Sequence, residues 1–229
     1  MNTSIKRPAS ARVATKNTGV HAKNGVRAPR ASRLQKQAQI LAEAELQFAR
    51  FGYEGVSLES IAVGLEMSRQ NMLYYYGSKE ELYDEVLDSV LDSWLQGMAT
   101  LAKEHDPETA ISSYIRSKLR FSQERPSGSA VFTREIMAGA PRYAAKLAKS
   151  VIPHLQADVR TFESWAKRGL IARIDFTHLM FVIWSSTQAY ADLAPQFAMF
   201  LGRRKLSGPD FEAAHALITS LVMQSLRKR

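Results

Sequence analysis

Apolar residues recur every three or four positions along most of this 229-residue chain, and this spacing constrains its fold more than any other feature. Such spacing places the apolar side chains on one face of an α-helix. No segment alternates apolar and polar residues as a half-buried strand does, so the sequence predicts an all-α protein. Helical patterns cover residues 41–51, 82–98, 111–121, 147–165, 177–191 and 211–221.

Two further helical segments, residues 57–65 and 69–76, are short and adjacent. Ser57 and Ser68 stand where N-cap residues stand. Ser78-Lys79-Glu80-Glu81 has the form of a capping box in front of the long helix that follows. Two short helices joined by a tight turn and braced by longer helices predict a helix-turn-helix in a three-helix N-terminal domain.

The second short helix carries side chains suited to reading DNA. Arg69, Gln70 and Asn71 occupy its start, where side chains of a recognition helix meet base edges; arginine pairs with guanine, and asparagine or glutamine with adenine. Lys79 opposes the dipole of the next helix, a conflict that a DNA phosphate would resolve; a solvated surface lysine is the alternative. Helical geometry places Met72 and Tyr76 on one buried face and Tyr74 outside, with Tyr75 open to either position.

The net charge of +9 is concentrated at the N-terminus. Residues 1–36 contain nine Lys and Arg and no acidic residue, whereas residues 37–90 contain three basic and ten acidic residues. We interpret residues 1–33 as a disordered basic arm that attracts DNA phosphates to an otherwise acidic domain. An organelle transit peptide, or a tail with no specific role, is the alternative.

Composition excludes several classes of protein. The chain has no cysteine, which excludes a disulfide scaffold, a thiolate zinc site and a cysteine nucleophile. The longest apolar run, residues 179–184, is too short to span a bilayer, and no apolar segment of a secretory signal follows the basic N-terminus. The histidines lack metal-ligand spacing. We therefore expect a soluble cytoplasmic protein with no membrane association, no cofactor and no metal.

Residues 34–82 resemble the N-terminal domain of TetR-family transcriptional repressors. The resemblance is carried by Ile61-Ala62, Ser68, Tyr75 and Ser78-Lys79-Glu80-Glu81-Leu82 together. Two positions depart from the family pattern: Glu66 stands where glycine is usual in the turn, and Leu73 where most members have a DNA-contacting tyrosine. Together with the side-chain chemistry above, the resemblance gives these expected contacts to double-stranded DNA: Ser57, Ser68, Arg69, Gln70, Asn71, Leu73, Tyr74, Tyr75 and Lys79.

Other stretches are similar to members of this family that regulate pyrimidine use. They are Asn71–Tyr75, Tyr114–Arg116, Ala138–Pro141 and His178–Asp192. This resemblance implies a homodimer on a palindromic operator, a ligand pocket in each C-terminal domain, and release of DNA by an effector such as uracil or thymine. The expected organisation is an arm (1–33), a helix-turn-helix domain (34–80) and a ligand-binding and dimerisation domain (81–229). We expect residues 177–195 and 209–226 to form the dimer interface.

The residues themselves say less about the ligand. Trp184 and Gln188 lie one helical turn apart, with Tyr190 on the same helix, and an aromatic ring beside an amide suits a planar nucleobase. The alternative is an aromatic stripe that is simply core. Trp165, Phe121 and Arg120 are weaker candidates for the same cavity.

Two other classes of function stay open beside a ligand-responsive repressor. One is an architectural DNA-binding protein without an effector. The other is an all-α enzyme, for which the chain shows no phosphate loop, no His-Glu-x-x-His motif and no nucleophile-base spacing.

Overall fold

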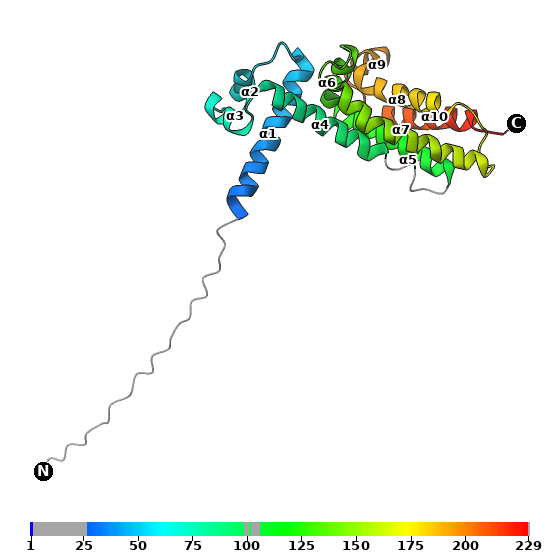
Figure 1. Cartoon of the computed structure of the whole chain (residues 1–229), viewed down its shortest axis with the longest axis horizontal. Coiled ribbons are helices and arrows are strands. Elements are labelled where there is room, and N and C mark those ends of the chain that lie inside the picture. Colours follow the sequence, from blue (N-terminus) through cyan, green and yellow to red (C-terminus); the bar gives the residue numbers. More distant parts are fainter. Residues whose placement is uncertain (2–26, 99–100, 102–105, 229) are drawn as a thin grey trace.

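The structure is a computed structural model that describes residues 27–98, 101 and 106–228 together with Met1. These residues form ten α-helices and no β-strand, which confirms the predicted all-α fold. Helices α1 to α3 form one end of the molecule, α5 to α10 form the other, and α4 runs between them (Figure 1). The helices are α1 (Arg27–Phe51), α2 (Leu58–Gly64), α3 (Arg69–Tyr75), α4 (Lys79–Met98), α5 (Pro107–Glu124), α6 (Pro126–Met137), α7 (Ala144–Lys167), α8 (Phe176–Asp192), α9 (Ala194–Phe200) and α10 (Gly208–Ser225).

Helix α1 is longer than predicted. It begins at Arg27, inside the segment 1–33 that we predicted to be disordered, so the prediction is wrong for residues 27–33. Arginine and alanine make up five of these seven residues and favour a helix that continues into the buried part of α1, and Pro29 stands in its first turn, where proline is tolerated. Residues 2–26 of the predicted arm lie outside the described residues.

Side-chain caps fix where the short helices begin. The Ser57 hydroxyl accepts a hydrogen bond from the Ser60 backbone N–H (3.1 Å), and the Ser68 hydroxyl accepts one from the Asn71 N–H (3.1 Å). Both N-caps were predicted and are confirmed. Met72 and Tyr76 are buried, also as predicted.

The C-terminal helices follow the predicted pattern, with two helices added. Helix α7 continues through Pro153, although proline inside a helix usually kinks or breaks it. Helices α6 and α9 were not recognised in the sequence. Both begin with proline in the first turn, at Pro126 and Pro195, where the missing N–H has no helical partner to lose.

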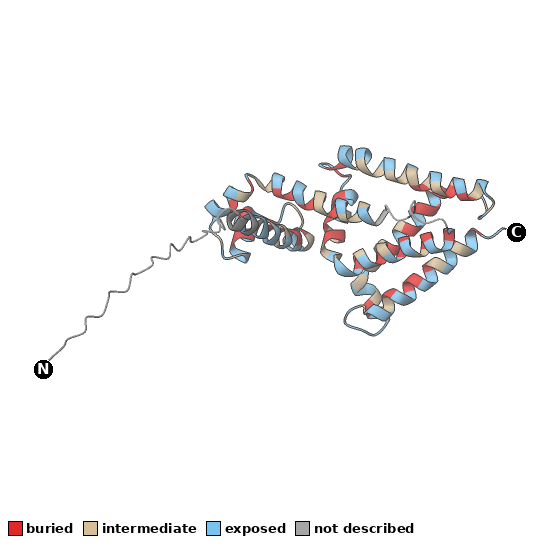
Figure 2. Cartoon of the chain, turned by 90° about the horizontal axis from the view of Figure 1, so that it is seen from below, coloured by how far each residue is buried: buried red, intermediate tan, exposed pale blue. Residues whose placement is uncertain are grey.

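Helix α6 completes the N-terminal hydrophobic core and also borders a cavity of the C-terminal domain. Val131 of α6 and Tyr143 at the start of α7 are buried in the same cluster as Phe48 and Ile61 of the N-terminal domain. Phe132, the next residue of α6, lines a cavity of the C-terminal domain. Figure 2 shows buried residues along the inner faces of both ends of the molecule and of α4 between them. The predicted boundary at residues 80/81 falls at the first turn of α4, whose Leu82 is also part of the N-terminal core.

The turn between α2 and α3 contains an unusual backbone conformation. Glu66 has φ of 54°, in the left-handed region that favours glycine. Its N–H bonds to the Val63 carbonyl (3.1 Å) and the Met67 N–H bonds to the Ala62 carbonyl (2.9 Å), the pair of bonds that closes a Schellman motif. The turn therefore has the backbone conformation that favours glycine, although the residue there is Glu66.

We expect Glu66→Gly to raise the free energy of unfolding by up to about 1 kcal/mol. A left-handed residue with a Cβ costs about 1–2 kcal/mol, and the extra freedom of glycine in the unfolded chain cancels part of this gain. Urea unfolding followed by circular dichroism measures the change. Glu66→Ala is the matched control, because it shortens the side chain but keeps the Cβ; equal stabilisation by both substitutions would contradict the backbone explanation.

Candidate functional site

The start of helix α3 presents a row of exposed polar side chains. Arg69, Gln70 and Asn71 are all exposed, as the helix-turn-helix prediction requires. The capping hydroxyl of Ser68 holds the first turn of α3. The N-cap of α2 is also linked to α1. Ser60, whose backbone N–H donates to the Ser57 hydroxyl, also donates a side-chain hydrogen bond to Gln47 of α1 (2.8 Å).

The guanidinium of Arg69 is already occupied within the protein. It forms an ion pair with Glu59 of α2, and both side chains are more than half exposed. An exposed pair of this kind contributes little to stability and exchanges easily for another acceptor. Glu59 therefore restrains the direction of Arg69 without preventing it from binding a base.

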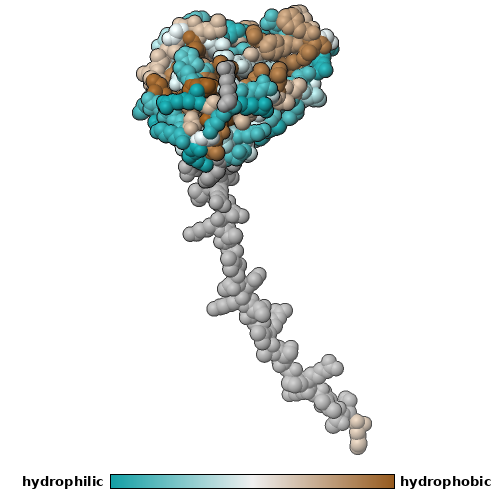
Figure 3. Space-filling view, turned by 90° about the vertical axis from the view of Figure 1, so that its right-hand side faces the viewer, coloured by the Kyte–Doolittle hydropathy of each residue, from teal (hydrophilic) through white to brown (hydrophobic). Residues whose placement is uncertain are grey.

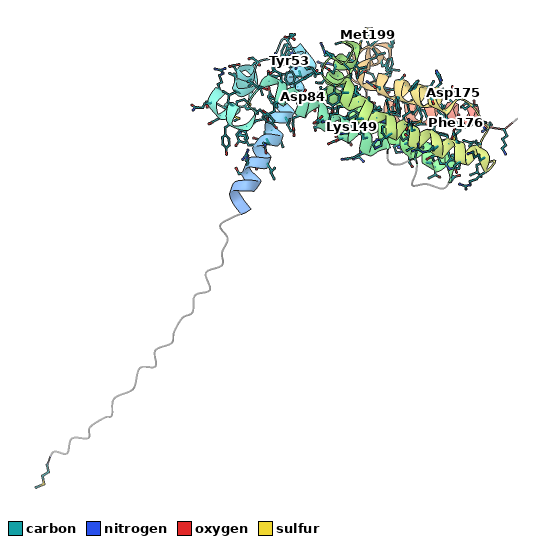
Figure 4. The ribbon with its side chains drawn as sticks, in the orientation of Figure 1. Tyr53, Asp84, Lys149, Asp175, Phe176 and Met199 are labelled. Atoms are coloured by element: carbon teal, nitrogen blue, oxygen red, sulfur yellow. The ribbon has the colours of Figure 1, made fainter. Side chains whose placement is uncertain are left out.

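Lys79 has a structural role that the sequence did not predict. Its ammonium lies 4.1 Å from the centroid of the Tyr53 ring and donates a hydrogen bond to the Tyr53 carbonyl (3.1 Å). The guanidinium of Arg142, from the α6–α7 connection, covers the same ring at 4.2 Å, and the Tyr53 hydroxyl donates to Glu80 (2.6 Å). Burial raises the pKa of Tyr53 to about 12, with the hydrogen bond to Glu80 acting in the same direction. Figure 4 places Tyr53 at the side of the N-terminal domain that faces the rest of the molecule.

The remaining predicted DNA contacts of α3 differ in exposure. Tyr74 is 66% exposed and Leu73 is 40% exposed. Tyr75 is half-buried and packs edge-on against Tyr74, with ring centroids 5.2 Å apart. Tyr74 is thus the aromatic residue of this helix that is most available to a partner.

A small cavity lies inside the C-terminal domain, where α4, α5, α6 and α8 meet. Its volume is about 20 Å³, room for about one water molecule, so a planar ring needs the walls to move apart. The walls combine aromatic and polar side chains. The lining residues are Val90, Trp94, Lys118, Phe121, Ser122, Ser129, Phe132, Thr187 and Gln188.

Two of the predicted ligand residues line this cavity and a third borders it. Gln188 donates hydrogen bonds to Thr133 (2.7 Å) and Asp192 (3.2 Å) from its Nε2. Trp184 packs edge-on against Trp94 at 5.0 Å and donates from Nε1 to the Tyr114 hydroxyl (2.7 Å). Phe121 is a lining residue. The amide nitrogen of Gln188 and the indole N–H of Trp184 therefore already have partners within the protein.

The other three predicted ligand residues lie elsewhere, and we correct their placement in this cavity. Trp165 is 2% exposed and packs against Phe162 in the core of the C-terminal domain. Tyr190 lines a separate apolar groove between α8, α9 and α10. Arg120 is on the surface in an ion pair with Glu124. Helical spacing could not distinguish these positions, because aromatic stripes of core and of cavity look alike in sequence.

A buried lysine and a buried aspartate are functional candidates that were not recognised in the sequence. Lys118 is 3% exposed, lies 3.6 Å from the centroid of the Trp94 ring, and donates to the Trp94 carbonyl (3.3 Å). Asp158 of α7 is 4% exposed, and its Oδ2 has no hydrogen-bond partner in the described part of the chain. A buried, unpartnered carboxylate oxygen is costly, so such groups are functional candidates.

Burial shifts the pKa values of both groups toward their neutral forms. Burial lowers the pKa of Lys118 well below its usual value, opposed by the charge of Asp158. Burial raises the pKa of Asp158 to about 7, opposed by the charge of Lys118. In the sequence, Lys118 occupies an otherwise apolar helix face between Tyr114 and Phe121; a charged residue at that position was the available signal.

A hydrogen-bonded network joins this region to the N-terminal domain. Arg125, between α5 and α6, donates from Nε (2.9 Å) and Nη2 (2.6 Å) to Glu45 of α1. Ser127 donates to the second oxygen of Glu45 (2.6 Å), and Arg125 also bonds to Ser93 of α4 (2.8 Å). Arg125 is three residues from Ser122 and four from Ser129, both of which line the cavity.

The other end of α6 contacts the N-terminal domain as well. Glu135 accepts hydrogen bonds from the Tyr83 hydroxyl of α4 (3.2 Å) and from the Arg142 backbone N–H (2.9 Å). The Arg142 side chain in turn covers Tyr53. Helix α6 thus borders the cavity in its middle and is bonded at both ends to the helices that carry α2 and α3.

Metal-binding clusters are absent from the described residues: no three His, Asp or Glu side chains converge there. Asp175 accepts a hydrogen bond from the His178 backbone N–H (3.0 Å) and so caps the start of α8. Within the described part of the chain no helix is long and apolar enough to span a membrane.

Two family models match consecutive segments of the sequence. The model for bacterial regulatory proteins of the tetR family matches residues 40–86. The model for the C-terminal region of YcdC-like proteins matches residues 87–229.

Curated relatives and solved structures agree with these models. The HTH-type transcriptional regulator RutR of Escherichia coli (strain K12) is 36% identical over 194 residues, covering 85% of this chain and 92% of the relative. The HTH-type transcriptional repressor NicS of Pseudomonas putida is 38% identical over 95 residues, 41% of this chain and 43% of the relative. The TetR family regulator PfmR from Thermus thermophilus has the same fold (TM-score 0.66, 20% identity, 83% of this chain and 97% of that one). So does AibR in complex with isovaleryl coenzyme A and operator DNA (TM-score 0.67, 15% identity, 84% of this chain and 100% of that one).

Proposed function

Because the chain belongs to the TetR family of bacterial regulatory proteins, we propose that it is a repressor that a small effector releases from a palindromic operator. The observation that carries this proposal is the capped helix α3, whose exposed Arg69, Gln70 and Asn71 suit base edges in the major groove. Such a regulator works in the cytoplasm, where its operator lies. The relatives are transcriptional regulators, which removes the alternative of an all-α enzyme.

The effector we propose is a pyrimidine such as uracil or thymine. The support is the resemblance to pyrimidine-responsive members and the chemistry of the cavity. Trp94 and Phe132 offer aromatic faces, and Gln188 brings a carbonyl oxygen that can accept a hydrogen bond from a ring N–H. Because the cavity is small, binding must separate its walls, and this movement would reach α6 and the network at Arg125.

The test uses the full chain and can begin before the operator is identified. Selection from random duplex DNA should enrich a palindromic sequence, and uracil or thymine should then weaken binding to it and raise the melting temperature of the protein. A palindrome whose binding no pyrimidine changes would contradict the pyrimidine proposal. Binding without sequence preference, and without stabilisation by any metabolite, would favour the architectural alternative.

The dimer interface we propose consists of α8 and α10. TetR regulators form dimers, and a palindromic operator requires a two-fold reader. Phe181 and Val182 of α8 and Leu217 and Leu221 of α10 are exposed apolar residues. Figure 3 shows hydrophobic residues gathered at the upper right of the face that the C-terminal domain presents, at the height of α9, whose Met199 is labelled in Figure 4.

We expect Leu221→Asp to produce monomers in sedimentation velocity experiments. Leu221 is 57% exposed in the single chain, so the aspartate costs little in a monomer but places a charge in the dimer interface. Affinity for a palindromic duplex should fall at least tenfold, because each monomer reads half of the site. Leu46→Asp on α1 is the control, since Leu46 has the same exposed fraction and lies outside the interface. A dimeric Leu221→Asp protein would place the interface elsewhere.

A further inference from the structure

The DNA-binding domain has few cations free to contact a phosphate. Residues 37–90 contain only three basic residues. Arg69 is paired with Glu59, Lys79 is held on Tyr53, and Arg50 lies in the last turn of α1, away from the start of that helix. Ten acidic residues share this segment, so the positive charge that a DNA backbone requires must come from another part of the chain.

Arg33 is the described cation best placed to supply it. It is an exposed residue near the start of α1, and its guanidinium carbon lies 5.3 Å from the centroid of the Tyr74 ring in α3. The described residues offer it no acidic partner within ion-pair distance. Because α1 is helical from Arg27, Arg33 has a fixed position beside the recognition helix instead of lying in a disordered arm.

The chemistry of arginine allows both contacts at once. The flat face of a guanidinium stacks on an aromatic ring, while the N–H groups at its edge remain free to donate to phosphate oxygens. Tyr74 can hold Arg33 in this way because its ring is 66% exposed and sits on the outer side of α3. A lysine at position 33 would lose the planar donor edge.

We propose that Arg33 and Tyr74 act as one phosphate-binding unit beside the recognition helix. The ring of Tyr74 positions the guanidinium of Arg33, which donates to the DNA backbone. The unit rests on the proposed function, because it operates only if the chain binds DNA. It gives Tyr74 a positioning role and makes the first turns of α1 part of the DNA-binding surface.

The test measures salt dependence on random-sequence duplex DNA, so it does not require the operator. Full-length Arg33→Ala, Tyr74→Ala and the double variant are titrated by fluorescence anisotropy at several salt concentrations. One phosphate contact per subunit contributes about 0.9 to the slope of log K against log salt, so losing two in a dimer should flatten the slope by about 2. The fall in affinity between about 50 and about 200 mM salt should therefore become about tenfold smaller.

The decisive comparison is between the single and double variants. If the two residues act as a unit, Tyr74→Ala should flatten the slope as much as Arg33→Ala, and the double variant should add nothing further. Tyr74→Phe should keep the wild-type slope, because it keeps the ring. Arg160→Ala, an exposed arginine of α7, is the charge-matched control and should change the slope little.

Each other outcome overturns the proposal in a distinguishable way. An unchanged slope in Arg33→Ala shows that Arg33 contacts no phosphate. A changed slope in Arg33→Ala with an unchanged one in Tyr74→Ala shows that the ring does not position it. Wild-type protein that fails to bind any duplex contradicts the proposed function as well. Circular dichroism melting of each variant verifies that the fold is intact.

Discussion

Arg125→Met should lower the free energy of unfolding by about 2 kcal/mol and loosen the DNA-binding domain from the rest of the protein. The side chain of Glu45 is 9% exposed, and two guanidinium N–H groups of Arg125 reach its Oε2. Removing the arginine leaves this carboxylate with Ser127 alone, and a lost hydrogen bond to a charged group costs about 1.5–3 kcal/mol.

Hydrogen exchange can locate the effect. Amides of α1 to α3 should exchange faster in Arg125→Met, while those in the core of the C-terminal domain should keep their protection. The response to an effector should also weaken, because Arg125 lies between the cavity and α1. The coupling free energy between an effector site and a DNA site is typically about 1–3 kcal/mol. Without this coupling, the effector should weaken DNA binding only a few-fold.

Arg116→Met is the matched control for this substitution. Arg116 also forms two hydrogen bonds to one carboxylate, that of Glu212, but both residues belong to the C-terminal domain. This variant should leave exchange in α1 to α3 unchanged. Faster exchange throughout both domains in Arg125→Met would indicate general destabilisation instead of a specific connection.

The largest effect on ligand response is expected for Lys118 and Asp158. Lys118→Met leaves Asp158 buried without its nearby cation, so the protein should lose stability and the pKa of Asp158 should rise further above its usual range. Lys118→Met combined with Asp158→Leu should recover wild-type stability or exceed it, because it removes both buried titratable groups, and apolar replacement of such buried partners is often neutral or stabilising by about 1–4 kcal/mol.

Function should separate from stability in this double variant. We expect it to bind DNA normally but to show neither a thermal shift nor DNA release with uracil or thymine. Lys149→Met, at an exposed lysine of α7 labelled in Figure 4, is the control and should keep both responses. A double variant that still responds to pyrimidines would show that the pair is only a structural part of the core.

The pair also predicts a dependence of stability on pH. Burial raises the pKa of Asp158 to about 7, above the value of about 4 in the unfolded chain, so the folded state binds its proton more tightly. The stability contributed by this proton is fully present below about pH 4 and is lost as pH rises through about 7. In urea titrations, the free energy of unfolding of the wild type should therefore fall relative to that of Asp158→Asn as pH rises from about 4 to about 7.

The DNA-binding half of the molecule could be predicted well because its signals are local. Ser57 and Ser68 cap helices within three residues of themselves, and the buried pair Met72 and Tyr76 follows from the helical period alone. The conformation of Glu66 could not be read from its side chain, since the hydrogen bonds that close the motif belong to the backbone.

The cavity of the C-terminal domain depends on contacts between segments that are distant in the sequence, so its lining was harder to predict. Lys118 and Asp158 belong to different helices, so nothing in the local pattern joins them. Trp165 and Trp184 both lie on apolar faces of helical segments, yet one is core and the other borders the cavity. Arg125 and Glu45 meet only because α6 packs against α1, and α6 itself was not recognised.

Because α6 follows α5 in the chain but completes the N-terminal core, this protein is not modular. A fragment ending at Met98 would retain the recognition helix but lack Val131 and Tyr143, which close one wall of its own core. A chimera that joins this N-terminal domain to the C-terminal domain of another regulator would meet the same difficulty, because its new α6 would have to fit a foreign core. Changes in operator preference are therefore easier to obtain by substitution on the exposed side of α3 than by exchanging whole domains.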